Sequence, residues 1–359
     1  MQAPVKYPIY TTVIEAQPLP EKVRTAVSLF HQNKLYVIGK GANNTVYSID
    51  DTHVLRVTDY RLRDHQRDSE FHGLNLQHRL NQCSHIAKIH QYGYIYKTNT
   101  DMRVYAVMDK LKGGTLHDKM YNNLDARVNI SNKDVVSIMR KLIEALQCID
   151  SNGYCHRDIK ADNIMITDKT DITSVQLIDF GFMAECSIEQ FSLVGTCGYT
   201  HLNSISIHGY TRDVDMWALG ILLIELLEGI ASTRAICKLQ EICISNKQNK
   251  MVCPEYYMAV YTLYSNVIKK HPIFKNLLKA LLGKHRAWGM MTASSEAFPT
   301  HNICNYDKLL LILDDINLDG GRRKSVRNSR VDKRKSKKIF RKKIKLTRKK
   351  NNKKKLDFA

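Results

Sequence analysis

The chain has 359 residues, of which 43% are hydrophobic and 25% are charged, and its formal net charge is +20. This apolar content is ordinary for a globular protein. The sequence has no run of 18 apolar residues and no hydrophobic segment within residues 1–20, so we expect neither a membrane-spanning helix nor a secretory signal peptide.

The first predicted elements are two strands joined by a glycine-containing turn, within residues 35–47. Gly39 and Gly41 lie in this turn, and glycine lets backbone N–H groups approach a phosphate closely. The pattern therefore favours a phosphate-binding loop over a plain hairpin only if further motifs follow.

A third strand is predicted at residues 53–57, with Arg56 among apolar neighbours. A helix through Glu70 would turn this carboxylate inward, with Leu74 one turn further along. Residues 104–111 form the next apolar strand.

A long helix is predicted after Ser131, which begins a sequence resembling a capping box. Gly153 ends the helix. Its apolar residues recur at helical spacing: Val135, Ile138, Met139, Leu142, Ile143, Leu146 and Ile149. We expect this helix to support the segment that follows it.

That segment, residues 156–163, reads His-Arg-Asp-Ile-Lys-Ala-Asp-Asn, and Asp179-Phe180-Gly181 begins sixteen residues after Asn163. Two short strands, 164–166 and 175–178, are predicted between them. If they pair as a hairpin, Asn163 and Asp179 lie together at its open end. Both side chains offer the oxygen ligands that Mg²⁺ prefers.

Two further motifs follow in the C-terminal half. Residues 192–199 read Ser-Leu-Val-Gly-Thr-Cys-Gly-Tyr, and residues 213–220 read Asp-Val-Asp-Met-Trp-Ala-Leu-Gly. The most apolar segment, 217–227, predicts a buried helix, and residues 277–282 predict a late one.

Taken together, these motifs resemble those of eukaryotic-type serine/threonine protein kinases, from about residue 33 to residue 230. The resemblance implies an α+β fold of two lobes, the first small and rich in β-strands and the second larger and helical. It implies a first lobe at 29–109 and a second lobe at 110–318, preceded by an extension, 1–28, and followed by a disordered basic tail, 319–359. It also implies ATP and Mg²⁺ as cofactors and protein hydroxyl groups as acceptors.

The same resemblance assigns roles to individual residues. Asp158 is expected to orient the attacking hydroxyl and receive its proton, and Lys160 to face the transferred phosphate. Thr196 is expected to bond both of them, while Asn163 and Asp179 hold Mg²⁺. Asp215 is expected to brace the backbone of the catalytic loop.

Nucleotide contacts are expected from both lobes. Glu70 is expected to pair with Arg56, Met108 to border the adenine, and the backbone of Asp109 and Leu111 to bond the base edge. The expected nucleotide-binding residues are Gly39, Lys40, Gly41, Val46, Arg56, Glu70, Met108, Asp109, Leu111 and Met165.

The chain departs from the family pattern in three places. Arg56 stands where the family has lysine, and its planar fork is less suited than a compact ammonium to lie between two phosphates and a glutamate. Asn44 occupies the third glycine position, for which we expect an unusual backbone angle. His201-Leu202-Asn203 replaces Ala-Pro-Glu, which resembles divergent kinases of large DNA viruses.

These departures leave alternatives open. Arg56 favours an inactive pseudokinase scaffold, unless Arg56 itself or Lys40 holds the phosphates. A small-molecule kinase on the same fold is a further alternative, and so is a nucleic-acid-binding protein that acts through its basic tail and carries a kinase domain. Ser192 is a candidate for an activating phosphate that would pair with Arg157.

Residues 321–359 contain 20 Lys or Arg and two Asp, a net charge of +18, which leaves +2 for residues 1–320. Such a segment cannot build a core, and its natural counter-charges are DNA, RNA or an acidic import receptor. We therefore expect a protein inside the cell, nuclear or cytoplasmic with the nucleus favoured, whose substrates are basic or DNA-associated proteins, with no membrane partner.

The nine cysteines contain no Cys-x-x-Cys pair and lie mostly in apolar stretches. We expect buried free thiols rather than disulfides or zinc ligands.

Overall fold

The computed structural model describes residues 21–41, 43–59, 61, 63–98, 101–121, 128–186, 194–200, 213–245, 254–282, 305–316 and 318. The predictions for the extension up to residue 20, Ser192, residues 201–203 and the basic tail lie outside these residues. Among the described helices, none combines the length and the apolar character needed to cross a membrane.

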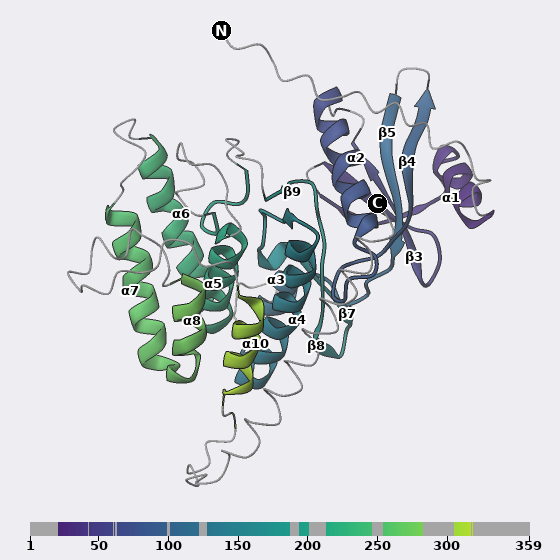
Figure 1. Ribbon diagram of the computed structural model, residues 1–359. Coiled ribbons are helices and arrows are strands. Elements are labelled where there is room, and N and C mark those ends of the chain that lie inside the picture. The colour runs from purple at the N-terminus through teal and green to yellow at the C-terminus, as the bar shows by residue number, and fades with distance from the viewer. Residues whose placement is uncertain are drawn as a thin grey trace, which may run out of the picture. The chain divides into compact units, whose positions relative to one another are not determined.

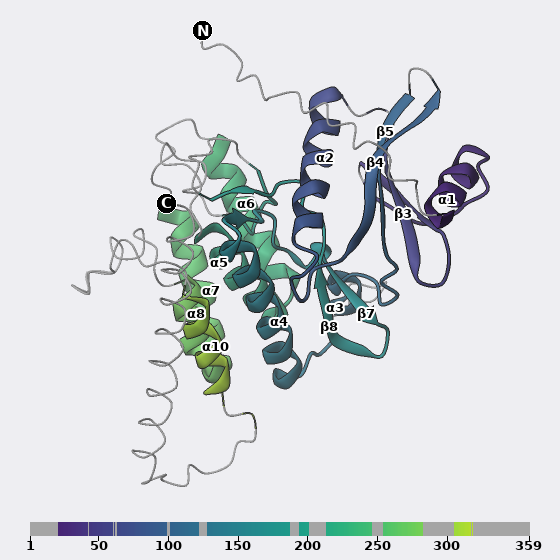
Figure 2. The same cartoon turned by 45° about the vertical axis from the view of Figure 1, so that its right-hand side comes forward.

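The N-terminal part of the fold is a five-stranded antiparallel sheet in the order β1-β2-β3-β5-β4, with one helix on each face (Figures 1 and 2). The strands are β1 (Tyr36–Lys40), β2 (Asn44–Ser48), β3 (His53–Thr58), β4 (Ile89–Thr98) and β5 (Asp101–Asp109). The helices are α1 (Glu21–His31) and α2 (Asp64–Arg79).

The alternation of apolar side chains along the strands explains why a helix packs on each face of the sheet. In β5, Tyr105 and Val107 share a core cluster with Phe30 of α1, whereas Val104 and Ala106 share another with Leu74 of α2. Successive side chains of a strand point to opposite faces, so both faces of this sheet are apolar and each is covered by a helix.

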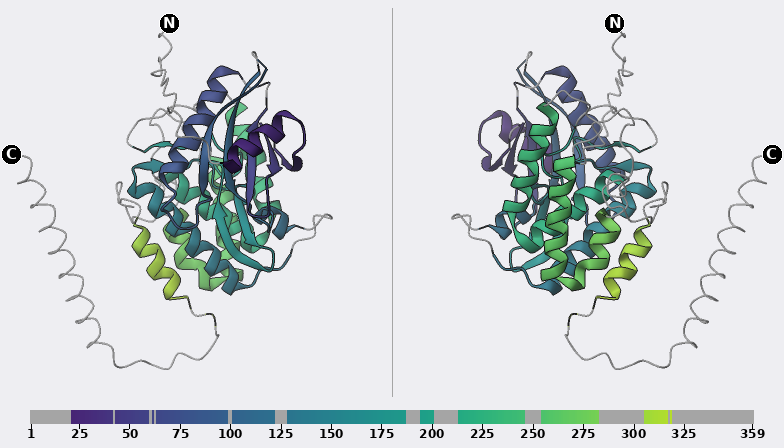
Figure 3. Two further views of the ribbon diagram at one scale, coloured as in Figure 1. Left: turned by 90° about the vertical axis from the view of Figure 1, so that its right-hand side faces the viewer. Right: turned by 90° about the vertical axis from the view of Figure 1, so that its left-hand side faces the viewer.

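Helix α1 crosses the predicted lobe boundary at residue 28. Ala26 and Phe30 are buried, and Phe30 packs against the strands, so the helix belongs to the packing of the first lobe (Figure 3, left).

The C-terminal part is mainly helical and surrounds one buried helix, α5 (Asp213–Glu228). Apolar side chains cover α5 on every side, and Trp217, Leu219 and Ile221 through Ile224 are fully buried, as expected for a helix at the centre of a core. Four helices pack against α5, namely α4 (Asn132–Ser151), α6 (Ile230–Ser245), α7 (Pro254–Lys270) and α8 (Lys275–Leu282). Helix α10 (Tyr306–Asp314) packs on α4 and α8, and the short α3 (Leu116–Met120) packs on the strands β7 and β8 that are described below. The predicted fold class of a β-rich lobe and a helical lobe is confirmed.

Helix α4 follows its sequence prediction closely. The Ser131 hydroxyl accepts a hydrogen bond from the backbone N–H of Asp134, and Gly153 ends the helix with a φ of +86°. Two short strand pairs come next in the chain: β6 (Tyr154–Cys155) with β9 (Ala184–Glu185), and β7 (Ile164–Asp168) with β8 (Asp171–Leu177). The predicted hairpin between residues 164 and 178 is therefore confirmed.

The expectation of free thiols is wrong for at least seven of the nine cysteines, because Cys243 is disulfide-bonded as well as the six in the three pairs that follow. The structure pairs Cys83 with Cys148, Cys155 with Cys186, and Cys197 with Cys237. The partners are 65, 31 and 40 residues apart and lie on different elements. Because neither local spacing nor apolar context reports such tertiary pairs, the sequence pattern carried no sign of them.

Candidate active site

Asp215 of α5 anchors the backbone of the segment 156–163, which follows α4. The two Asp215 carboxylate oxygens accept hydrogen bonds from the backbone N–H groups of His156 (2.7 Å) and Arg157 (2.8 Å). Burial raises the pKa of Asp215, although the charge of His156 and the two N–H bonds oppose this shift. Arg157 adopts a φ of +70°, a rare value for a side chain of this size. The two hydrogen bonds to buried Asp215 therefore fix a loop whose backbone is strained at Arg157.

Asp158, Lys160, Asn163 and Thr196 converge on one point. The Asp158 carboxylate accepts a hydrogen bond from the Thr196 hydroxyl at 2.6 Å and lies 2.9 Å from the Lys160 ammonium. Lys160 also donates to the Thr196 hydroxyl at 2.7 Å. Asp158 is only 5% exposed, so these bonds fix one orientation of its carboxylate.

The hairpin β7–β8 brings Asn163 next to Asp179. The backbone N–H of Ile178 donates to the Asn163 carbonyl at 2.9 Å, at the hairpin's open end. The Asn163 amide nitrogen donates to the carboxylate and the carbonyl of Asp158 (2.7 and 2.9 Å), which leaves its Oδ1 as the remaining acceptor. Asn163 Oδ1 and the half-exposed Asp179 carboxylate are hard oxygen donors, so the pair fits Mg²⁺.

Phe180 anchors the segment that carries Asp179. Its ring is buried and meets the His156 ring edge to face, with centroids 4.8 Å apart. Gly73 of α2 faces the Phe180 backbone so closely that a Cβ there would lie 2.7 Å from the Phe180 carbonyl oxygen. A glycine is therefore required for α2 to reach this segment.

Arg56 lies on the face of the sheet that α2 covers. Its neighbours Leu55 and Val57 belong to the cluster on the α1 side, so alternation turns Arg56 to the opposite face. Its guanidinium donates to Glu70 at 2.8 Å and lies 3.9 Å from Asp179. Although burial acts in the other direction, these two carboxylates raise the pKa of Arg56 above its usual range. The expected pair of Arg56 and Glu70 is present, and it also approaches Asp179.

The expected nucleotide-binding residues lie on the two lobes as follows. Gly39 and Lys40 end β1, with Lys40 exposed, and Val46 of β2 pairs with Arg56. Met108 and Asp109 end β5, Leu111 follows, and Met165 of β7 bridges to Thr115. A Cβ at Gly39 or Gly41 would make only an ordinary contact at 3.8 Å with the described residues.

The expectation that Asn44 adopts an unusual backbone angle is wrong. Asn44 is the first residue of β2 and accepts the Gly41 N–H at 2.8 Å. It is absent from the described residues with positive φ, so no unusual backbone angle is needed at this position.

Residues 32–287 match the model of the protein kinase domain. The chain belongs to the protein kinase family. The fold agrees, because the crystal structure of the kinase domain of PF14_0431 superimposes with a TM-score of 0.53 at 19% identity, covering 70% of this chain and 90% of that one.

The kinase is also similar to several serine/threonine-protein kinases. It is 30% identical to PAK 1 of Mus musculus over 219 residues, 58% of this chain and 38% of that protein. It is 29% identical to pak-1 of Caenorhabditis elegans over 218 residues, 58% and 36%. It is 33% identical to shk1/pak1 of Schizosaccharomyces pombe over 139 residues, 38% and 19%. The kinase thus spans less than two fifths of each of these relatives.

Sequence reasoning missed a buried acid, Glu225, in the core of this kinase's helical lobe. Glu225 of α5 is fully buried and accepts hydrogen bonds from the hydroxyls of Tyr199 and, at 3.2 Å, Tyr121. Burial raises the pKa of Glu225, although both hydroxyls oppose this. The one sequence signal was a glutamate interrupting an apolar helix, which is best explained by polar partners within the core.

Proposed function

We propose that this kinase transfers the γ-phosphate of ATP to serine or threonine hydroxyls of proteins, with Asp158 as the catalytic base. The observation that carries this proposal is the set of bonds among Asp158, Lys160, Thr196 and Asn163. Phosphoryl transfer needs positioning and charge compensation more than covalent chemistry, and this cluster supplies both.

The roles follow from the chemistry of each group. Asp158 is a carboxylate held in one orientation, suited to receive the proton of an incoming hydroxyl. Lys160 lies beside it as a cation for the moving phosphate. Asn163 and Asp179 would hold Mg²⁺, which when bound neutralises charge on the phosphate oxygens. Arg56, fixed by Glu70, would face the phosphates from the first lobe.

A pseudokinase scaffold is the second candidate, and Arg56 is the observation that favours it. The guanidinium is engaged by Glu70 and Asp179, so less of its charge is left for ATP. Against this, Asp158, Lys160, Asn163 and Asp179 are all present, and an inactive fold has no chemical need of them.

The test is transfer of labelled phosphate from ATP to a basic protein, with parent and Asp158→Asn. The variant should lose transfer and keep nucleotide binding, because the phosphate and metal contacts remain. Asp179→Ala should instead weaken binding of Mg²⁺-ATP itself. Asp168→Asn, at an exposed turn ten residues downstream of Asp158, is the matched control. Parent-level turnover in purified Asp158→Asn would refute the assignment.

The basic tail, 321–359, is proposed to bind the phosphate backbone of nucleic acids and to favour residence in the nucleus, where an import receptor would read the same basic runs. Its charge density supports this, because each neutralised phosphate releases a counterion. Substrates that are basic or DNA-associated would follow from this location. The replacement of Ala-Pro-Glu further supports a kinase of the large-DNA-virus type.

Duplex binding at two salt concentrations tests the tail. The parent should bind without sequence preference and weaken steeply with salt, and a chain ending at residue 320 should not bind but should keep kinase activity. A shuffled tail of identical composition should still bind, because charge alone is recognised. Equal duplex binding and equal nuclear accumulation with and without the tail would overturn the proposal.

A further inference from the structure

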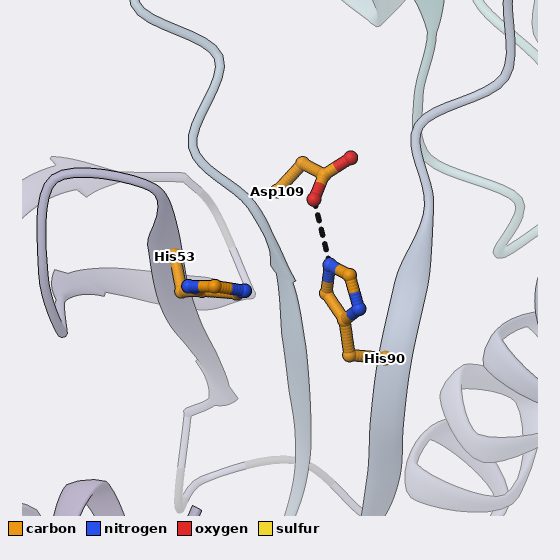
Figure 4. A group of neighbouring side chains, drawn as sticks. All are labelled: His53, His90 and Asp109. Carbon is orange, nitrogen blue, oxygen red and sulfur yellow. Dashed lines mark hydrogen bonds and ion pairs between the residues drawn. The ribbon is translucent and has the colours of Figure 1, made fainter. Parts of the chain in front are cut away.

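His53, His90 and Asp109 form a compact group on the sheet, apart from the magnesium ligands (Figure 4). One ligand atom from each of the three side chains lies within 4.8 Å of the other two. His90 Nε2 is 2.6 Å from Asp109 Oδ1, and the two imidazole centroids are 4.9 Å apart. We infer that this group is a binding site for a zinc ion, and the inference does not depend on the proposed kinase activity.

The backbone explains why the three side chains meet. His53 at the start of β3 and Asp109 at the end of β5 are direct partners across two antiparallel strands, so their side chains share one face. His90 is the extra residue of a β-bulge, since Ile89 pairs with Met108 and Gln91 with Val107. A bulge re-aims its side chain, and here it turns His90 towards Asp109.

A second carboxylate orients His53. Its Nδ1 contacts Asp50 Oδ1 at 3.1 Å and the Thr52 hydroxyl at 2.8 Å. Asp50 and Thr52 therefore hold the Nδ1 side of the ring, and the Nε2 side faces His90 and Asp109 (Figure 4). Zinc-ligating histidines are oriented in this way by a carboxylate behind the ring.

The donor set selects the ion. Two imidazoles and one carboxylate match zinc, whereas Mg²⁺ and Ca²⁺ prefer oxygen donors throughout. Donors around a tetrahedral zinc lie about 3.3 Å apart, so any pair in the group would close by at most about 1.5 Å. His90 Nε2 and Asp109 Oδ1, at 2.6 Å, would instead open by about 0.7 Å, and side-chain rotation supplies both changes. Three protein ligands leave a fourth position for water, as the partial exposure of His90 and Asp109 allows.

Only one other such group occurs among the described residues, made of Cys197, Cys237 and Glu241. Its two cysteines are joined in a disulfide, so their sulfurs are not thiolates able to bind zinc. The histidine group is therefore the stronger candidate.

The experiment is a titration of the full chain with Zn²⁺ by calorimetry, repeated with Co²⁺ followed by absorption. The parent should bind one ion more than His53→Gln or His90→Gln, or bind it at least 10-fold more tightly. Asp50→Asn should weaken binding about 10- to 100-fold, because it removes only the orienting carboxylate. The Co²⁺ complex should show d–d bands without thiolate charge transfer.

His85→Gln is the matched control. His85 also contacts a carboxylate, Glu144 at 3.1 Å, but it belongs to no group of three ligands within the part of the chain that the structure describes. This variant should bind like the parent. Circular dichroism of every variant separates loss of the site from loss of the fold, and Zn²⁺ should raise the Tm of the parent but not of His90→Gln. Equal titration of the parent, His53→Gln and His90→Gln, or a purely thiolate cobalt spectrum, would overturn the inference.

Discussion

Arg56 and Glu70 form an ion pair of 2.8 Å in which arginine stands where the family has lysine. The two side chains are only 15% and 14% exposed, and the Arg56 guanidinium lies 3.9 Å from Asp179. If Arg56 holds the phosphates, Arg56→Ala should lower kcat/KM by several decades, each worth about 1.4 kcal/mol of transition-state stabilisation. Arg56→Lys should keep most of the transfer, because an ammonium still carries the charge.

Steady-state phosphate transfer measures this. Arg61→Ala is the matched control, because Arg61 pairs with Asp59 on the surface at 2.6 Å. This variant is expected to leave kcat/KM unchanged. Unchanged transfer in Arg56→Ala would show that another residue, such as Lys40, holds the phosphates. A large gain in Arg56→Lys over an inactive parent would favour the pseudokinase alternative.

The Thr196 hydroxyl forms hydrogen bonds with both Asp158 and Lys160. Its removal should therefore leave both side chains less firmly oriented. Hydrogen bonds to charged groups are worth about 1.5–3 kcal/mol, which predicts that Thr196→Val lowers kcat about 10- to 150-fold. Thr196→Ser keeps the hydroxyl and should stay close to the parent. Single-turnover kinetics tests this, and equal kcat in Thr196→Val and Thr196→Ser would contradict it.

The sequence predicted the parts of the site that depend on local pattern. The helix capped by Ser131, the hairpin between Asn163 and Asp179, and the inward turn of Glu70 follow from periodicity and turn chemistry. The features it missed depend on which distant segments meet. No sequence pattern around Gly73 indicates that the Phe180 carbonyl packs against it. No pattern around Cys83 indicates a disulfide with Cys148. The approach of His90 to Asp109 depends on a bulge that no periodicity displays.

Gly73 is predicted to control the position of α2. Alanine normally stabilises a helix relative to glycine, but here its Cβ would lie 2.7 Å from the backbone of Phe180, which cannot rotate away. Gly73→Ala should therefore destabilise the fold by about 1–3 kcal/mol, the usual cost of overpacking. By displacing Glu70 it should also reduce kcat/KM.

Urea unfolding and phosphate transfer check this together. His65→Ala, at an exposed position of the same helix, should change neither by a comparable amount. A Gly73→Ala protein more stable than the parent would show that α2 does not rest against Phe180.

The disulfide between Cys83 and Cys148 should stabilise the fold by closing a 65-residue separation across the loop after α2 and the helix α4. Disulfides typically stabilise a fold by about 2–4 kcal/mol. Cys83→Ala should lose about that much in urea unfolding under oxidising conditions and clearly less when both proteins are reduced. An identical loss in both conditions would mean that only packing was removed.

Glu225 predicts how stability depends on pH. Because burial raises its pKa in the folded state, the proton is bound more tightly there than in the unfolded chain. The stabilisation from this proton is complete below the unfolded pKa of about 4.3 and is lost as pH rises through the raised pKa. Glu225→Gln cannot ionise and can still bond the Tyr121 and Tyr199 hydroxyls. Its free energy of unfolding relative to the parent should therefore rise as pH rises across this window. Unfolding by urea at a series of pH values measures the difference, and a constant difference between the two proteins would show that Glu225 titrates alike in both states.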